Sequence, residues 1–149
     1  MRNILFLCTG NSARSIMAEA YMNQAGAGDW RAFSAGSKPT GSPNPFALTT
    51  LTQHEISLGN DVPRSKSWDE FASDKAPIMD FIVTVCDNAA GEVCPVWPTQ
   101  NGKAPQVKHW SFPDPAAIEG GDAQKREAFE KVFSSIRAQI DKLLKEEAR

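Results

Sequence analysis

Four short apolar segments alternate with longer segments in which apolar residues recur at helical spacing. The apolar segments cover residues 4–7, 30–34, 81–85 and 106–110, and each has the length of a β-strand. Strands that alternate with helices are typical of a parallel sheet joined by right-handed crossovers. The pattern therefore predicts an α/β fold, with a small four-stranded parallel sheet and helices on both faces.

Three segments carry the helical pattern. The first covers residues 15–24, and the second covers residues 45–51, where Pro45 stands at the first turn and Asn44 is suited to cap it. The last helix has the clearest pattern, with apolar residues on one face and charged residues opposite. These apolar residues are Phe129, Val132, Phe133, Ile136, Ile140, Leu143 and Leu144.

Length and composition predict a single domain over residues 1–149. A chain of 149 residues with 41% hydrophobic and 23% charged residues has the values of one globular domain. Stretches rich in Pro and Gly at 36–45, 90–102 and 112–121 are interpreted as loops, because each is flanked by elements of the same sheet.

A net charge of −2 gives no general attraction to nucleic acid or to a membrane surface. We expect a cytoplasmic protein, because no segment has the pattern of a leader or a membrane span.

Residues 8–15 read Cys-Thr-Gly-Asn-Ser-Ala-Arg-Ser and connect the first predicted strand to the first predicted helix. Such a turn brings backbone N–H groups together at the positive end of the helix dipole. Gly10 and Asn11 tolerate the left-handed backbone of an anion-binding nest, and Arg14 offers a planar fork of donors. A tetrahedral oxyanion is therefore predicted to bind the loop formed by Cys8, Thr9, Gly10, Asn11, Ser12, Ala13 and Arg14.

Cys8 is the predicted nucleophile of this loop. A helix N-terminus and a guanidinium both favour the thiolate, which is the reactive form. The hydroxyl of Ser15 is placed to add a hydrogen bond to the sulfur. Cys8 alone would suit a buried structural position, but its spacing from Arg14 across a strand-to-helix junction favours chemistry.

Other reactive groups also follow strands, and ligands bind beyond the carboxyl ends of the strands in an open parallel sheet. Ser34 ends the second strand, where its hydroxyl either supports the loop by a hydrogen bond to Asn11 or is simply that of a strand-end serine, and Cys86 follows the third strand. Asp114 lies beyond the fourth strand, between two prolines. It is the candidate general acid, although a solvated turn aspartate has the same pattern.

The chain has three cysteines, an odd number that does not suit a lasting disulfide framework in a reducing compartment. A zinc site is not expected, because Cys86, Cys94, His54 and His109 lack the spacing of a ligand set. Cys86 and Cys94 are either reduced core residues or the later members of a relay that carries oxidation away from Cys8.

Several motifs along nearly the whole chain resemble one family. They are residues 8–15, Met17-Ala18-Glu19, Ser34-Ala35-Gly36, residues 83–87, Cys94-Pro95, His109-Trp110 and Pro113-Asp114-Pro115. Together they resemble the arsenate reductases that share the low-molecular-weight protein tyrosine phosphatase fold.

This resemblance implies that arsenate binds the loop, that Cys8 attacks arsenic and that Asp114 assists loss of an oxygen. It also implies that Cys86 then attacks Cys8, and that Cys94 next attacks Cys86. The resulting disulfide would be reduced by thioredoxin, or by glutaredoxin with glutathione, as the partner. No bound cofactor or metal is implied.

The chain departs from relatives at three places. Ala13 stands where many relatives have a further cysteine, and Ala116 and Ala117 follow the Asp-Pro pair where phosphatases have tyrosines. Some reductases of this kind hold a monovalent cation through an acidic side chain after the second helix, but residues 64–67 here read Arg-Ser-Lys-Ser. The alternatives to a reductase are a phosphatase that uses Cys8, Arg14 and Asp114, and a noncatalytic oxyanion or redox sensor.

Overall fold

The predicted strands pair in one parallel sheet. The computed structural model describes residues 1–56, 64–73, 75–85 and 104–148. The sheet has the order β2-β1-β3-β4, and each neighbouring pair is parallel. Because Leu7 pairs with both Ala35 and Thr84, the carboxyl ends of β1, β2 and β3 meet at one edge. The strands are β1 (Arg2–Leu7), β2 (Trp30–Ala35), β3 (Phe81–Thr84) and β4 (Gln106–His109).

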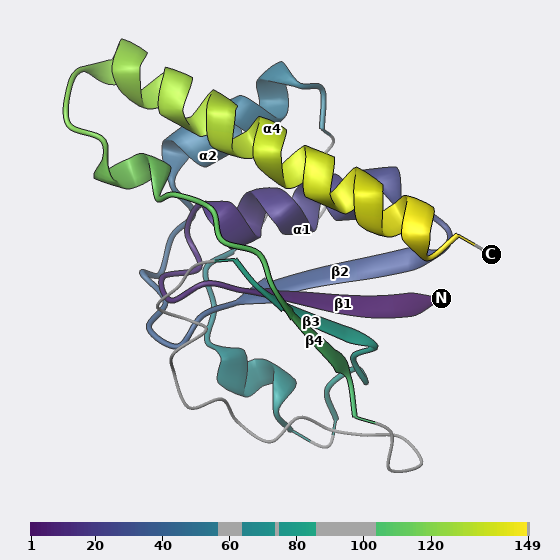
Figure 1. The fold of residues 1–149 in the computed structure, drawn as a ribbon. Helices are drawn as coiled ribbons and strands as arrows, with labels where there is room; N and C mark the ends of the chain where they lie inside the picture. The colour runs from purple at the N-terminus through teal and green to yellow at the C-terminus, as the bar shows by residue number, and fades with distance from the viewer. Residues whose placement is uncertain (57–63, 74, 86–103, 149) are drawn as a thin grey trace.

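Three α-helices gather on one face of the sheet (Figure 1). They are α1 (Arg14–Ala25), α2 (Pro45–Gln53) and α4 (Asp122–Glu146). The 3-10 helix η1 (Trp68–Phe71) lies on the opposite face, and a second one, η2 (Pro115–Ala117), precedes α4. The predicted fold class is confirmed, and in the described residues η1 is the helix on the second face.

Strand β1 runs through the centre of the hydrophobic core. Ile4 and Phe6 point to the core formed with α1, α2 and α4, whereas Leu5 and Leu7 point to the core that includes Phe71 of η1. All four β1 side chains are fully buried. Burying a side chain of this size contributes about 1.5–3 kcal/mol, so the core fixes β1 firmly and defines where the chain leaves the sheet.

The helix boundaries agree closely with the sequence pattern. Helix α2 begins at Pro45, and the Asn44 side chain accepts a hydrogen bond from the backbone N–H of Phe46 at 2.8 Å, as predicted for a cap. Helix α1 begins at Arg14, one residue earlier than predicted. None of the helices in the described parts of the chain is both long and apolar enough to cross a membrane.

Candidate functional site

The loop between β1 and α1 is buried at the carboxyl edge of the sheet. Cys8 is 6% exposed, and Asn11 and Ser15 have no exposed surface. Helix α1 starts within this loop, and its N-cap residue Ala13 supplies no side-chain cap. The N-terminal N–H groups of an α-helix have no partner within the helix, so this end of α1 keeps donors available to a bound anion.

The carbonyl groups of the loop are held from outside by neighbouring segments. The pairs are Thr9 O with Lys38 N at 3.0 Å, Gly10 O with Thr40 N at 3.0 Å and Ser12 O with Asn44 N at 2.7 Å. In a trans peptide the C=O and the following N–H point in opposite directions. The N–H groups of Gly10 and Ala13 therefore face into the loop, and no described residue accepts a hydrogen bond from them.

Asn11 holds the bend of the loop. It is in the left-handed region with φ of 43°, as its residue type suggested, whereas Gly10 has no positive φ. Its side-chain Nδ2 donates to Ser15 Oγ at 2.8 Å, and its Oδ1 accepts from the backbone N–H of Lys66 at 2.9 Å. The expected partner Ser34 was wrong, because Ser34 Oγ donates to Glu19 at 2.9 Å instead.

Gly36 brings the end of β2 against the loop. A Cβ atom built at this position would lie well inside 3.0 Å of the carbonyl oxygens of Cys8 and Thr9. The N–H of Gly36 donates to Lys66 O at 3.0 Å, and its carbonyl accepts from Trp68 N at 2.9 Å. Only a residue without a side chain fits between the loop and the segment that follows residue 63.

Arg14 is the cationic group of the site. Its Nη1 donates to Phe112 O at 2.9 Å, and its Nη2 lies 3.9 Å from Asp114 Oδ2. The Nε atom is buried and has no hydrogen-bond partner in the structure. A buried N–H without an acceptor is costly, and a bound oxyanion would satisfy it.

Asp114 lies beside Arg14, as the position beyond β4 predicted. Its Oδ1 accepts from Ala116 N at 3.0 Å and so caps η2, which leaves Oδ2 directed toward Arg14. The Asp114 side chain is 46% exposed. A carboxyl group at the mouth of the loop is in a position to exchange protons with both solvent and a bound anion.

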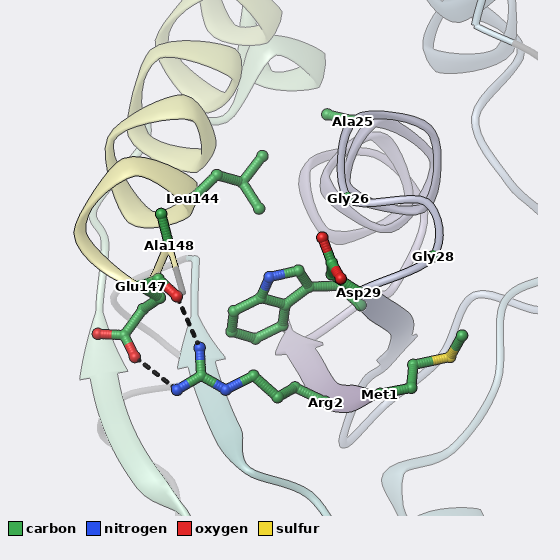
Figure 2. A pocket seen from close by; sticks show the side chains of 10 residues that line it. Met1, Arg2, Ala25, Gly26, Gly28, Asp29, Leu144, Glu147 and Ala148 are labelled. Atoms are coloured by element: carbon green, nitrogen blue, oxygen red, sulfur yellow. Dashed lines mark hydrogen bonds and ion pairs between the residues drawn. The ribbon is translucent and has the colours of Figure 1, made fainter.

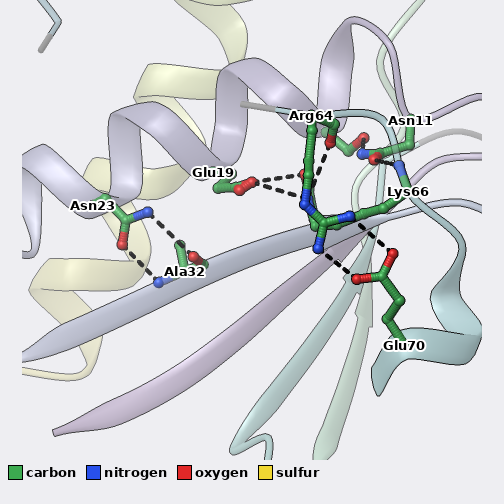
Figure 3. A network of polar contacts seen from close by, with 9 residues as sticks. Asn11, Glu19, Asn23, Ala32, Arg64, Lys66 and Glu70 are labelled. Carbon is green, nitrogen blue, oxygen red and sulfur yellow. Dashed lines mark hydrogen bonds and ion pairs between the residues drawn. The ribbon is translucent and has the colours of Figure 1, made fainter. Parts of the chain in front are cut away.

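Two residues that sequence reasoning did not assign lie behind the loop. The ammonium of Lys66 is 3.6 Å from Glu19 Oε1, and both side chains are largely buried (Figure 3). Lys66 stands in the segment where some reductases of this kind have an acidic side chain, but nothing in the sequence marks its ammonium as buried. Within the described ranges, no group of three or more His, Cys, Asp or Glu residues is arranged to hold a metal ion.

His109 and Trp110 lie at the carboxyl end of β4, on the edge of the sheet that carries the loop. His109 Nδ1 and Thr84 Oγ1 are 2.7 Å apart at the carboxyl ends of β4 and β3, and the Trp110 ring packs 6.1 Å from that of Phe6. Cys86 and Cys94 lie outside the described residues. The structure thus brings the loop and Asp114 together.

Comparisons with known proteins agree with this geometry. The family model described as low molecular weight phosphotyrosine protein phosphatase matches residues 3–149. The chain is 37% identical over 135 residues to the arsenate reductase of Bacillus subtilis (strain 168), covering 89% of this chain and 88% of that protein.

Two solved structures are similar to this fold. The arsenate reductase from Archaeoglobus fulgidus superposes with a TM-score of 0.69 at 30% identity, covering 95% of this chain and 98% of that one. A thioredoxin-dependent arsenate reductase of Corynebacterium glutamicum has a TM-score of 0.69 at 23% identity. That match covers 98% of this chain but only 61% of the Corynebacterium chain, and it shows the fold alone.

Proposed function

The chain belongs to the low molecular weight phosphotyrosine protein phosphatase family, and we propose that it reduces arsenate to arsenite. The observation that carries the proposal is a set of unsatisfied donors around Cys8. They are the N–H groups of Gly10 and Ala13 and the buried Nε of Arg14. Donors fixed in this way suit a tetrahedral oxyanion such as arsenate or phosphate.

The first step is attack of the Cys8 thiolate on arsenic, which forms an S–As bond and expels an oxygen. Arg14 and the loop N–H groups hold the remaining oxygens, and the departing oxygen takes protons and leaves as water. Asp114 is the proposed proton donor, because its Oδ2 faces Arg14 at the mouth of the loop. Arsenic is still in the +5 state after this exchange.

Reduction requires a second thiol. Cys86 attacks the sulfur of Cys8, the S–As bond breaks, and its electron pair remains on arsenic, so arsenite leaves as a Cys8–Cys86 disulfide forms. Cys94 then attacks Cys86, which returns Cys8 as a thiolate and leaves a Cys86–Cys94 disulfide. This relay is proposed from the sequence, since both distal cysteines lie outside the described residues.

An external thiol donor completes the cycle in the cytoplasm. Thioredoxin is the first donor to test, because the Corynebacterium protein of the same fold is thioredoxin-dependent. Glutaredoxin with glutathione is the alternative. No resident cofactor enters any step of the proposal.

One observation favours reduction over hydrolysis of phosphotyrosine. Pro115, Ala116 and Ala117 form η2 beside Asp114, so these three positions offer no aromatic ring to stack on a substrate ring. The single tyrosine, Tyr21, is in α1, where its hydroxyl contacts Asp141 at 2.5 Å. A small oxyanion needs no stacking partner.

Arsenite release measured with each donor tests the proposal. Without a donor, each chain should release one arsenite and lose two titratable thiols. Cys8→Ser should release none while keeping its melting temperature, because the substitution is nearly isosteric. Cys86→Ser should not turn over repeatedly; full turnover of this variant with thioredoxin would refute the relay. Hydrolysis of a phosphotyrosine peptide that is unaffected by Cys86→Ser would instead identify a phosphatase.

A further inference from the structure

A buried ion pair lies behind the anion-binding loop, and the proposed chemistry does not use it. Lys66 lies near the start of the described segment 64–73, and Glu19 is in the second turn of α1. Their side chains are 8% and 14% exposed, and Lys66 Nζ is 3.6 Å from Glu19 Oε1. Figure 3 shows the two side chains pointing toward each other between α1 and the sheet.

Burial makes each charge costly on its own. It raises the pKa of the Glu19 carboxyl group and lowers the pKa of the Lys66 ammonium, and the opposite charge of the partner works against both shifts. Two further hydrogen bonds support the pair. Ser34 Oγ donates to Glu19 at 2.9 Å, and Lys66 Nζ donates to Arg64 O at 3.1 Å.

Lys66 and its neighbour Ser65 also form hydrogen bonds with the loop. The N–H of Lys66 donates to Asn11 Oδ1 at 2.9 Å, and Asn11 Nδ2 donates to Ser15 Oγ at 2.8 Å. Ser65 Oγ also donates to Gly10 O at 3.2 Å. A displacement of residues 65 and 66 would therefore move Asn11, the residue with the left-handed backbone, together with the carbonyl group of Gly10.

We propose that the Lys66–Glu19 ion pair positions the anion-binding loop by anchoring the segment that holds Asn11. Lys66 acts as a positioning residue, because it reaches the site only through Asn11 and its neighbours. The inference concerns oxyanion binding at Cys8, and it rests on the proposed function only in assigning the loop as the anion site.

Stability alone does not account for this arrangement. Replacing a buried ion pair by apolar residues of similar size is often neutral or stabilising, because the desolvation cost of two charges disappears. The alternative role is purely structural: the pair would hold α1 and residues 64–67 together without any specific effect on the loop. The two roles make different predictions for anion affinity.

Anion affinity can be measured without any turnover. In a Cys86→Ser/Cys94→Ser background, Cys8 is the only cysteine of the chain. The phosphate concentration that halves the rate of Cys8 alkylation by iodoacetamide then reports anion binding in the loop. This readout is the same whether the bound anion is later reduced or hydrolysed, so failure of the arsenate assay would leave it intact.

A double-mutant cycle separates positioning from stability. Lys66→Met and Glu19→Gln each leave one buried charge unpaired, and each should lower the melting temperature and raise the half-protecting phosphate concentration. We expect a rise of about tenfold, or ~1.4 kcal/mol. The double variant buries no charge and should recover the melting temperature but not the phosphate affinity. Recovery of both would overturn the proposal.

Chemical rescue gives an independent test and covers the case in which Lys66→Met does not fold. Lys66→Ala should regain phosphate affinity when propylammonium fills the vacated space, whereas tetramethylammonium at equal ionic strength should have no effect, since it has no N–H donor. Lys131→Ala is the matched control, because Lys131 pairs with Glu127 in an exposed position on α4.

Ser34→Ala, a milder variant, should weaken phosphate binding with a small change in melting temperature. Unchanged affinity in both Lys66→Ala and Ser34→Ala would refute the inference.

Discussion

The two ends of the sheet differ in whether their polar groups are satisfied. At the amino end, a cavity of about 320 Å³ opens between α1, β2 and the end of α4 (Figure 2). Arg2 crosses it, donates to Glu147 O at 3.2 Å and Glu147 Oε1 at 2.9 Å, and lies 4.9 Å from the centre of the Trp30 ring. Both contacts drawn in Figure 2 therefore join Arg2 to Glu147.

The carboxyl end shows the opposite pattern. Around Cys8, the Nε of Arg14 is buried without a partner, and the N–H groups of Gly10 and Ala13 have no described acceptor. Unsatisfied buried donors are rare in folded proteins and call for an explanation. The proposed functional end is therefore distinguished by buried donors that lack hydrogen-bond partners, whereas the cavity lies at the other end of the sheet.

Arg14→Lys should show the largest effect of three changes that probe this comparison. Lysine keeps the positive charge but cannot offer the planar fork, so the oxyanion loses Nε as a donor and the bond to Phe112 O is lost as well. Loss of one preorganised donor typically costs about 10²–10³-fold in catalysis. Arsenite release and phosphate protection of Cys8 would both measure the loss.

The melting temperature is the control for this variant. It should change little, because loss of the bond to Phe112 O is offset by removal of a buried donor that nothing satisfies in the unbound chain. A variant that keeps wild-type phosphate affinity would show that the unpartnered Nε does not serve the anion.

Much of this contrast follows from local sequence patterns. The alternation of strands and helices predicted the sheet, and the position of each residue after a strand placed Cys8 and Asp114 at the same edge. Asn11 was recognised because asparagine tolerates positive φ, a property of the residue itself. These features depend on short stretches of chain, which is why periodicity and residue type reveal them.

The supports of the loop could not be predicted in this way. Lys66 contacts Asn11 across 55 positions of the chain, and Ser34 donates its hydrogen bond to Glu19 instead of to Asn11. Such pairings depend on how α1 and residues 64–67 pack against the sheet, and one sequence carries no signal for them. A lysine followed along the chain by a serine gives no hint that its ammonium is buried.

Gly36→Ala and Gly26→Ala form a pair that separates the two ends. Each added Cβ would clash: at Gly36 with the carbonyl oxygens of Cys8 and Thr9, and at Gly26 with Trp30 Cβ at 2.9 Å. Overpacking of this kind typically costs about 1–3 kcal/mol. Both variants should unfold at lower denaturant, but only Gly36→Ala moves the loop and should weaken phosphate protection of Cys8.

The pair is informative because each added Cβ lies closer than 3.0 Å to a neighbouring atom, one at each end of the sheet. If Gly26→Ala weakens phosphate binding as much as Gly36→Ala does, anion affinity follows global stability, and the carboxyl end has no separate role in binding. If Gly36→Ala binds phosphate normally, the loop tolerates displacement of its carbonyl groups, and their outward hydrogen bonds do not set its geometry.

Arg2→Gln should have the smallest effect, because Arg2 and Glu147 satisfy each other at the end of the sheet opposite the loop. The Arg2 and Glu147 side chains are 22% and 26% exposed, so solvent screens their ion pair, and about 0–1 kcal/mol of stability is at stake. Denaturant unfolding of Arg2→Gln, Glu147→Gln and the double variant would measure their coupling.

Phosphate protection of Cys8 should be unchanged in all three, because no hydrogen bond of Arg2 reaches the loop in the described residues. A loss of phosphate affinity at this distance would show that the satisfied end and the unsatisfied end are energetically coupled through β1.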